Sequence, residues 1–188
     1  SGLAGAPLMN LEAAAVPNGG ITALLILRKA NIRSGQKVLI YGASGSVGTF
    51  AVQLAKAFGV EVTGVCSTSN VELVKSLGAD YVIDYTKKES VNIVKEYDFI
   101  LDAVGKIKTS ELKEMCKKAL TPNGKYVSID DGSLLLDSNR LGLIKDLIET
   151  GHIKPVVDRS YPLEQIVEAH EYVGKGHKKG GVAITICN

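Results

Sequence analysis

The sequence has little of what nucleic-acid binding, membrane insertion or disulfide bonding requires. It contains no tryptophan, three cysteines and 5% aromatic residues, and its formal net charge is +2. No basic run could follow a phosphate backbone, and the cluster Lys175–Lys179 is interpreted as a helix end. No apolar stretch reaches the roughly 18 residues of a membrane span, and no signal peptide opens the chain. We therefore expect a cytoplasmic protein with neither a nucleic-acid nor a membrane partner.

Metal ligands and catalytic pairs are equally scarce. Cys66, Cys116 and Cys187 lie far apart, and no C-x-x-C or Cys/His pair occurs at ligand spacing. The three histidines are scattered in the same way. The sequence therefore predicts no metal site and no catalytic acid–base residue.

What the sequence does contain, from Gln36 onward, is an alternation of short β-branched runs with helical patterns. The chain has 188 residues, 45% of them hydrophobic, which is enough to bury one α/β core. Such alternation is typical of repeated βαβ units. We expect an α/β fold with a doubly wound six-stranded parallel Rossmann sheet, helices on both faces and the strand order 3-2-1-4-5-6.

The boundaries of the elements follow from the apolar patterns and from the Gly, Pro and Asn residues between them. The predicted strands cover Lys37–Tyr41, Glu61–Cys66, Tyr81–Asp84, Asp98–Asp102, Gly124–Ile129 and Pro155–Val157. The helices predicted between them cover Val47–Phe58, Asn70–Leu77, Ser90–Glu96, Thr109–Leu120 and Asn139–Thr150. At the two ends of the chain we expect helices at Leu11–Val16, Ile21–Ala30 and Leu163–Gly174, and a strand at Val182–Ile186.

These patterns divide the chain into three parts. Residues 1–34 form an inter-domain helical segment, broken at Pro17-Asn18-Gly19-Gly20. Residues 35–158 form a Rossmann domain, and residues 159–188 form a C-terminal return helix and strand.

The first predicted strand leads directly into a glycine-rich turn and an apolar helix. Gly42 permits a tight turn, Gly45 lets the backbone approach a pyrophosphate, and Gly48 lets the helix pack closely on the strand. A nucleoside triphosphate is disfavoured, because no Lys follows Gly48 as in a G-K-[ST] loop. We expect a dinucleotide pyrophosphate to bind at the positive end of the helix, on the backbone N–H groups of Ser44, Gly45, Ser46, Val47 and Gly48.

The end of the second predicted strand bears on the choice between NADH and NADPH. An acid about 20 residues after the glycine turn would bind the ribose hydroxyls of NADH. In this chain the position falls at Cys66-Ser67-Thr68-Ser69-Asn70, which permits a 2′-phosphate and offers hydroxyl and amide donors to it. Tyr85, at the end of the third strand, adds a phenolic donor. We expect NADPH as the cofactor, with NADH as the alternative because no Arg stands at this position.

Asp102 and Asp130 end the fourth and fifth predicted strands, where the nicotinamide half of a dinucleotide would lie. One interpretation is a carboxylate pair for acid–base chemistry. The other, which we favour, is that each carboxylate caps neighbouring backbone N–H groups.

Further segments occur in order and at the spacing of one family. They are Glu12–Pro17 followed by Gly20–Ala23, then Gly35–Ile40, the glycine turn, Leu77–Tyr85 and Asp102–Gly105. On these segments the chain resembles the medium-chain dehydrogenase/reductase superfamily, and most of all its zinc-independent quinone oxidoreductase branch. The resemblance covers nearly the entire chain. It implies an NAD(P)H-dependent oxidoreductase in which a GroES-like catalytic domain precedes the Rossmann domain, and a chain that lacks most of that catalytic domain.

The resemblance also implies roles for particular residues. It places Thr22 near the nicotinamide, Val104 beside the ribose-nicotinamide, and Ser67, Asn70 and Tyr85 around the 2′-phosphate. Cys66 and Ala103, at the neighbouring strand ends, complete the predicted cofactor-binding set. The implied substrate is a quinone, an activated alkene or a related carbonyl compound, held by the missing catalytic domain. A homodimer formed by pairing of sheet edges is expected as well.

Two other functions are open on the sequence. A short-chain reductase would share the glycine spacing but commonly uses a Tyr-x-x-x-Lys pair, and none of the seven tyrosines has Lys four residues later. A non-catalytic dinucleotide-sensing domain is the second alternative.

Overall fold

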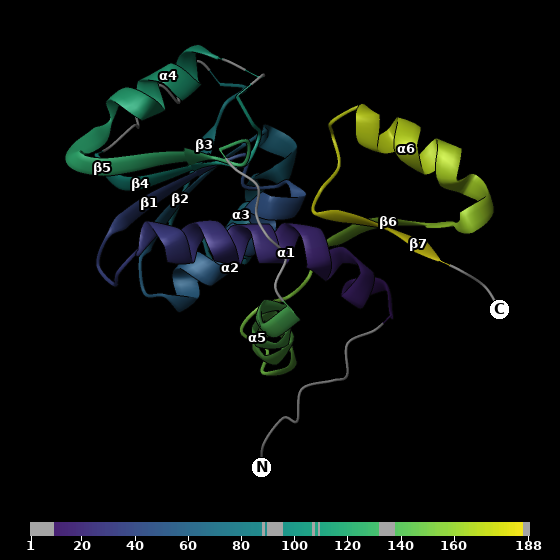
Figure 1. The fold of residues 1–188 in the computed structure, drawn as a ribbon. Helices are drawn as coiled ribbons and strands as arrows, with labels where there is room; N and C mark the ends of the chain where they lie inside the picture. Colours follow the sequence, from purple (N-terminus) through teal and green to yellow (C-terminus); the bar gives the residue numbers. More distant parts are fainter. Residues whose placement is uncertain are drawn as a thin grey trace.

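The computed structural model describes residues 10–87, 89, 96–106, 108, 110–131 and 138–185, with side chains from residue 18 onward except at 138–141. Its centre is a parallel sheet of five strands in the order β3-β2-β1-β4-β5 (Figure 1). The strands are β1 (Lys37–Tyr41), β2 (Glu61–Cys66), β3 (Tyr81–Asp84), β4 (Tyr97–Asp102) and β5 (Leu120–Ser128). The parallel α/β sheet of a Rossmann-like domain, as predicted, is confirmed.

Both faces of this sheet are covered by helices. Successive side chains of a strand point to opposite sides, so each strand contributes to the core on both faces. Val38 and Ile40 of β1 pack into one apolar cluster, and Leu39 packs into a second one on the other face. The first cluster is covered by α1 (Asn10–Ala30), α2 (Ser46–Ala57), α3 (Val71–Ser76) and α5 (Ser138–Glu149), and the second by α4 (Glu111–Lys118). A ligand therefore reaches the sheet at the ends of its strands. None of the helices that the structure describes is long and apolar enough to cross a membrane.

The prediction of a sixth strand in this sheet is wrong. The segment predicted at Pro155–Val157 leads into β6 (Val157–Pro162), which pairs with β7 (Gly181–Thr185) in a separate parallel sheet. The chain just before β6 is bound by Gln53 of α2, whose amide accepts from the N–H of Lys154 at 2.7 Å and donates to the carbonyl of Lys154 at 3.0 Å. These two bonds hold the chain beside α2 and away from β5. The predicted boundary at 158/159 falls inside β6, and the three-part division of the chain stays a prediction.

The predicted break in the first helix is also wrong, because α1 continues through Pro17 and the two glycines after it. A Cβ at Gly19 would overlap the carbonyl oxygen of Ser46, and a Cβ at Gly20 would touch the ring of Phe50. The glycines therefore serve the close packing of α1 against α2.

The strand predicted at Gly124–Ile129 begins four residues earlier in the structure, because Pro122–Gly124 lie within β5 as a bulge. Tyr97 of β4 pairs with Leu120, and the next pair joins Phe99 to Lys125, so residues 121–124 protrude from the ladder. The predicted helix at Ser90–Glu96 lies almost entirely outside the described residues. The remaining predicted elements agree with the structure to within about two residues at each end, apart from a 3-10 turn at Leu163–Gln165 that begins the last predicted helix.

The C-terminal unit of β6, β7 and α6 (Ile166–Gly174) lies to one side of the main sheet (Figure 1). It contacts the glycine turn directly, because the N–H of Gly180 donates to the carbonyl of Ser44 at 2.9 Å. Within the unit, the carboxylate of Asp158 accepts from the hydroxyl of Tyr172 at 2.5 Å and from the N–H of Lys179 at 3.0 Å. The segment after α6 is thereby fixed next to the glycine turn.

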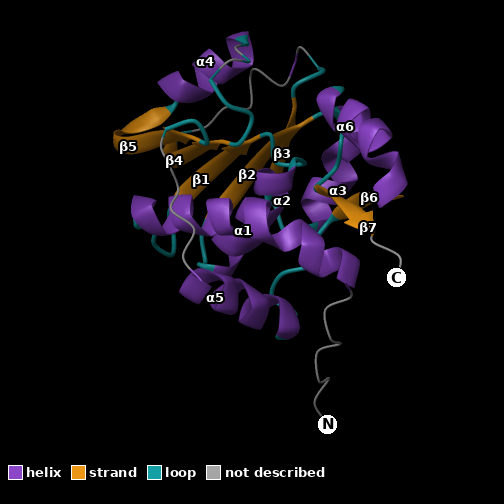
Figure 2. Ribbon diagram, turned by 45° about the vertical axis from the view of Figure 1, so that its right-hand side comes forward, coloured by secondary structure: helices purple, strands orange, loops and turns teal. Residues whose placement is uncertain are grey.

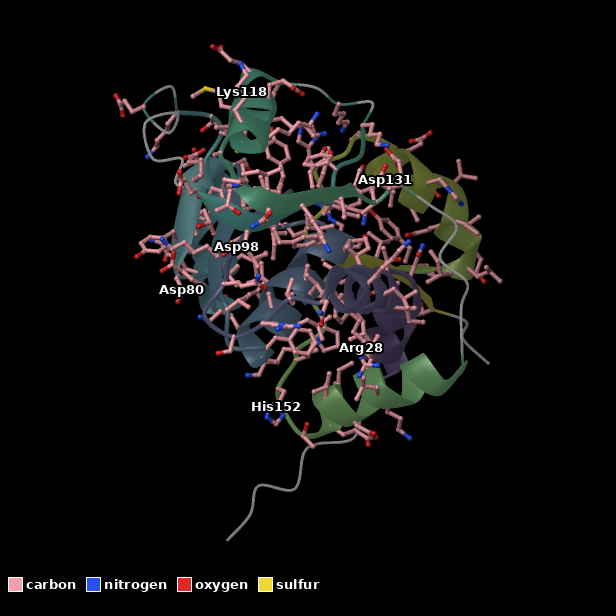
Figure 3. All side chains as sticks on the ribbon, turned by 60° about the vertical axis from the view of Figure 1, so that its left-hand side comes forward. Arg28, Asp80, Asp98, Lys118, Asp131 and His152 are labelled. Atoms are coloured by element: carbon pink, nitrogen blue, oxygen red, sulfur yellow. The ribbon has the colours of Figure 1, made fainter. Side chains whose placement is uncertain are left out.

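Asp80 links α2 to the start of β3, at the amino ends of the strands. Figure 3 labels Asp80 and Asp98 at this end of the sheet and Asp131 at the opposite end. The carboxylate of Asp80 accepts from Lys56 Nζ at 2.8 Å and from the N–H of Val62 at 2.7 Å. Partial burial disfavours its charged form, but these hydrogen bonds prevail and lower the pKa of Asp80.

We expect Asp80→Asn to lower the free energy of unfolding by about 1 kcal/mol at pH 7, since both side chains of the ion pair are partly solvated. Because the folded-state pKa of Asp80 is depressed, this stability is present above the unfolded pKa of about 3.9 and is lost as pH falls through the folded value. Urea unfolding at pH 7 and pH 3 measures both effects. The control is Glu72→Gln, which removes an exposed pair with Lys75 and should change stability little. An Asp80→Asn deficit of the same size at pH 3 would contradict the account.

Candidate cofactor-binding site

A cleft of about 460 Å³ opens at the carboxyl ends of β1, β2 and β4. This is the edge at which the strand order reverses, since β2 and β4 lie on opposite sides of β1. In doubly wound sheets a ligand binds at such a switch point. Figure 2 shows the loops that follow these strands, and the C-terminal unit beside them. The cleft is lined by Tyr41, Gly42, Ser44, Gly45, Ser46, Cys66, Tyr85, Ala103, Val104, Lys108, Ser110, Gly176 and Lys178.

The glycine turn has the geometry of a phosphate cradle. Gly42 has φ +82°, and a Cβ there would lie 2.5 Å from Val104 Cγ2. A Cβ at Gly48 would overlap the carbonyl oxygen of Gly42, so helix and strand touch backbone to backbone. Gly45 is the N-cap of α2 and offers no side chain to the N–H groups of the first turn. That turn, all of which the structure describes, carries no acidic residue, and its N–H groups are left to bind an anion.

The end of β2 is joined to the glycine turn by Asn70. Asn70 is 8% exposed, and its Nδ2 donates to the hydroxyls of Ser44 and Ser67, each at 3.1 Å. Because both hydroxyl oxygens accept from the amide, their own O–H groups can act as donors, that of Ser67 with the hydroxyl of Ser69 at 3.2 Å as one acceptor. Asn70 Oδ1 is buried and has no hydrogen-bond partner among the described residues. In the predicted 2′-phosphate region the hydroxyls of Ser44 and Ser67 are therefore partly exposed, whereas the amide of Asn70 is buried.

The end of β3 presents Tyr85 to solvent beside a buried carboxylate. Tyr85 is exposed, and Asp84 before it accepts from the hydroxyls of Thr68 and Thr86 at 2.6 and 2.7 Å. Burial would raise the pKa of Asp84, but these hydrogen bonds outweigh it and the pKa is lowered. The charged Asp84 therefore holds together the ends of β2 and β3.

The ends of β4 and β5 settle the role of the two aspartates. Asp102 Oδ1 accepts from the N–H groups of Val104 and Gly105 at 3.1 and 3.2 Å, and Asp130 accepts from the N–H of Lys106 at 2.6 Å. Both carboxylates cap backbone N–H groups, as the favoured interpretation held. Asp102 is completely buried, whereas Asp130 is exposed. They form no acid–base pair.

Two lysines give the cleft a positive charge. Lys178 and Lys108 are among its lining residues, and none of the described lining residues is acidic. Lys178 Nζ donates to the carbonyl of Gly180 at 2.9 Å, and burial lowers the pKa of Lys178 although nearby Asp158 acts in the opposite direction. A bound phosphate would place a further negative charge next to this half-buried ammonium. The donors of the cleft therefore fit an anionic dinucleotide.

The structure brings most of the predicted cofactor-binding residues together. Those that line the cleft are Gly42, Ser44, Gly45, Ser46, Cys66, Tyr85, Ala103 and Val104. Those that do not line it are Thr22, half-buried on α1, Val47 and Gly48 in the first turn of α2, and Ser67 and Asn70 behind the end of β2. The cofactor roles of all thirteen stay predictions.

Sequence reasoning missed Lys178, Lys108, Gly176, Tyr41 and Ser110. The cluster Lys175–Lys179 was interpreted as a helix end, and α6 does end at Gly174, but the chain beyond it turns back to the glycine turn. The signal in the sequence was Gly180-Gly181. A Cβ at Gly180 would overlap the carbonyl oxygen of Val156, which marks a close backbone approach.

We expect Lys178→Met to weaken NADPH binding about 10-fold, because the variant loses one charge-assisted hydrogen bond to the cofactor. The matched control is Lys175→Met, an exposed lysine of the same cluster, which should bind like the unchanged chain. Fluorescence titration with NADPH at 50 and 200 mM salt measures both. Equal affinities for the two variants would show that Lys178 does not meet the cofactor.

Among the described residues no group of three or more His, Cys, Asp or Glu side chains gathers as a metal site would require. We assign no residue of this region to a metal.

Comparison with known proteins extends these observations. The zinc-binding dehydrogenase family profile matches residues 46–133, and a second profile of the same description matches residues 132–184. The mitochondrial NAD(P)H oxidoreductase RTN4IP1 of Mus musculus is 33% identical in an alignment 223 positions long, gaps included, that covers 95% of this chain and 56% of that protein. The chloroplastic NADPH-dependent alkenal/one oxidoreductase of Arabidopsis thaliana is 33% identical in an alignment 185 positions long, gaps included, that covers 92% of this chain and 46% of that protein.

A solved structure agrees with the sequence matches. The quinone oxidoreductase from Coxiella burnetii superimposes with a TM-score of 0.80 at 26% identity, covering 96% of this chain and 62% of that one. The chain spans about half the length of the curated relatives it matches. By its family profiles, its relatives and its fold, the chain belongs to the medium-chain dehydrogenase/reductase superfamily and corresponds to the cofactor-binding region of quinone oxidoreductase-like members.

Proposed function

We propose that the chain is the NADPH-binding part of an oxidoreductase that transfers hydride to a quinone, an activated alkene or a related carbonyl compound. The observation that carries this proposal is the cleft itself. At the switch point of the sheet lie a glycine cradle, the N–H groups of the first turn of α2, which have no side-chain cap, and two lysines. None of the described lining residues is acidic.

The strand order supports one direction for the proposed dinucleotide. With the pyrophosphate on the glycine turn after β1, the adenosine lies over β2 and β3 and the nicotinamide over β4. The hydroxyls of Ser44 and Ser67 and the phenol of Tyr85 are then the donors nearest the adenosine ribose. No carboxylate extends into this end of the cleft from its described lining, which supports NADPH over NADH.

When bound, the cofactor would supply a hydride for an electron-poor atom of the acceptor, and solvent would supply the one proton that completes the two-electron reduction. The chain's own residues bind the pyrophosphate, orient the nicotinamide with Val104 and its loop, and shield one side of the ring from water. None of them needs to act as an acid or a base.

The substrate class rests on the relatives. One is named as an alkenal/one oxidoreductase and another as a quinone oxidoreductase, and both have length beyond the part matched by this chain. We propose that a second domain closes the cleft and holds the substrate. The exposed apolar side chains of the C-terminal unit are a suitable surface for it, namely Leu163, Ile166, Val167 and Val173.

Two further expectations remain proposals. The main sheet ends in β3 and β5, and we propose that a homodimer forms by pairing of one of these edges with its copy. The relatives named above are mitochondrial and chloroplastic, so the expected compartment of this chain also stays a prediction.

Binding and turnover, measured together, test the proposed function. We expect the 188-residue chain to enhance or shift NADPH fluorescence on binding and to leave NADPH unconsumed when a quinone or an alkenal is added. Turnover by the chain alone would contradict the need for a second domain. NADPH binding that changes self-association, in a full-length protein without any turnover, would support the dinucleotide-sensing alternative instead.

A further inference from the structure

We infer that Lys113 is a positioning residue that fixes the nicotinamide side of the cleft. This inference rests on the proposed NADPH function and adds a residue that the glycine turn and the strand ends do not reveal. Lys113 lies on α4 and forms an ion pair with Asp102 at 2.6 Å, and the two side chains are 3% and 0% exposed.

The ammonium of Lys113 binds backbone carbonyl groups of the loop between β4 and α4. Besides Asp102, its Nζ donates to the carbonyls of Gly105 at 2.7 Å and of Lys108 at 2.8 Å. An ammonium has three donors, and each has an acceptor here. Lys108 lines the cleft and Gly105 follows the lining residue Val104, so these bonds fix the backbone of the cleft wall.

The carboxylate of Asp102 holds the same loop from its other end. Its Oδ1 accepts from the N–H groups of Val104 and Gly105, and its Oδ2 accepts from the hydroxyl of Tyr126 at 2.5 Å in addition to Lys113. Carboxylate and ammonium together therefore bind both N–H and C=O groups of the loop. Every strong donor and acceptor site of the pair is used, which gives the network one geometry.

A third contact joins this network to the cleft. Ser110 caps α4 by accepting from the N–H of Lys113 at 3.1 Å, and its hydroxyl lies 2.8 Å from the hydroxyl of Tyr41. Both Ser110 and Tyr41 line the cleft, and Lys113 Nζ lies 5.5 Å from the centre of the Tyr41 ring. The wall that would face the nicotinamide is thus built around one buried cation.

Stability alone does not account for such a pair. Two buried charges are costly to desolvate, and an apolar pair of similar volume is often as stable or more stable. What the pair adds is the conformation of the loop, because an apolar side chain could not bind the carbonyls of Gly105 and Lys108. A loop fixed before binding does not have to be ordered by the cofactor.

The position of Lys113 predicts which half of the cofactor should bind more weakly when Lys113 is replaced. The pyrophosphate and adenosine parts of the site are built from the glycine turn, the end of β2 and Lys178, and none of these contacts Lys113 through a described hydrogen bond. The nicotinamide part lies against the loop at Val104. Loss of the network should therefore weaken NADPH binding without weakening the binding of adenosine 2′,5′-bisphosphate, which lacks the nicotinamide half.

The test compares the two ligands on the 188-residue chain by calorimetry. The variant is the double substitution Asp102→Asn with Lys113→Met, which leaves no buried charge unpaired and keeps an amide oxygen for the N–H groups of Val104 and Gly105. We expect it to bind NADPH about 10-fold more weakly, as expected for a loop that must be ordered on binding, and to bind adenosine 2′,5′-bisphosphate with unchanged affinity.

The control is Lys118→Met, which removes an exposed lysine of the same helix, labelled in Figure 3. It should bind the two ligands like the unchanged chain. Equal weakening of both ligands by the double variant, or of neither, would overturn the positioning role. Failure of the unchanged chain to bind NADPH would instead overturn the proposed function, and this inference with it.

Discussion

The Gly48→Ala variant should bind NADPH about 100-fold more weakly than the unchanged chain, a loss of roughly 2.7 kcal/mol. Its added Cβ would overlap the carbonyl oxygen of Gly42 and lie 2.8 Å from the Cα and carbonyl carbon of Ala43. The neighbouring atoms are backbone and cannot rotate away, so α2 has to move off β1. The N–H groups at its first turn would then move away from the pyrophosphate.

Calorimetry with NADPH and thermal unfolding measure the two consequences of this substitution. Overpacking should also lower stability by about 1–3 kcal/mol. The matched control is Gly142→Ala on α5, where a Cβ has nothing within 4 Å and the helix should gain stability. Unchanged NADPH affinity in a folded Gly48→Ala protein would mean that the cofactor does not bind at the first turn of α2.

A single carboxylate at the end of β2 should reverse the preference between cofactors. In Ser67→Asp, the new charge stands where a 2′-phosphate would bind, and it can accept from the ribose hydroxyls of NADH. Asn70 Nδ2, which donates to Ser67 Oγ at 3.1 Å, would keep an acceptor. We expect NADPH affinity to fall about 10- to 100-fold, as for two like charges in a partly buried site, and NADH affinity to hold or rise.

The control for this exchange is Ser67→Asn, which has the same shape without the charge. It should weaken NADPH binding far less than Ser67→Asp does. Parallel titrations of the two variants with both cofactors separate charge from shape. If Ser67→Asp still preferred NADPH, the adenosine ribose would not lie at the end of β2.

Local signals in the sequence predicted the parts of the site that a short stretch of chain builds. The strand Lys37–Tyr41, the turn after it and the helix from Ser46 have their cause in neighbouring residues, namely buried β-branched side chains and glycines at fixed spacing. Asp102 was interpreted as a cap for the same reason, since the N–H groups of Val104 and Gly105 follow it within three residues. Asp130 was also interpreted as a cap, but the N–H group that it binds belongs to Lys106, in the loop after β4.

Contacts between distant segments could not be predicted in this way. Gln53 binds Lys154, and the strand after it pairs with β7 in a second sheet, yet neither contact is signalled in the sequence. Lys178 reaches the cleft because Gly180 binds Ser44, and Lys113 is buried because Asp102 lies beneath α4. From the sequence alone a lysine is expected at the surface, because a buried lysine needs a partner that the sequence does not reveal. The cationic half of the site was therefore missed.

The central claim is that the cleft binds a dinucleotide with its 2′-phosphate at the end of β2. The most direct measurement is calorimetric titration of the unchanged chain with NADPH and with NADH in one buffer. The account predicts one site per chain and an affinity for NADPH at least about 10-fold higher, from charge-assisted hydrogen bonds to the 2′-phosphate. Equal affinities for the two cofactors, or no binding of either, would contradict it.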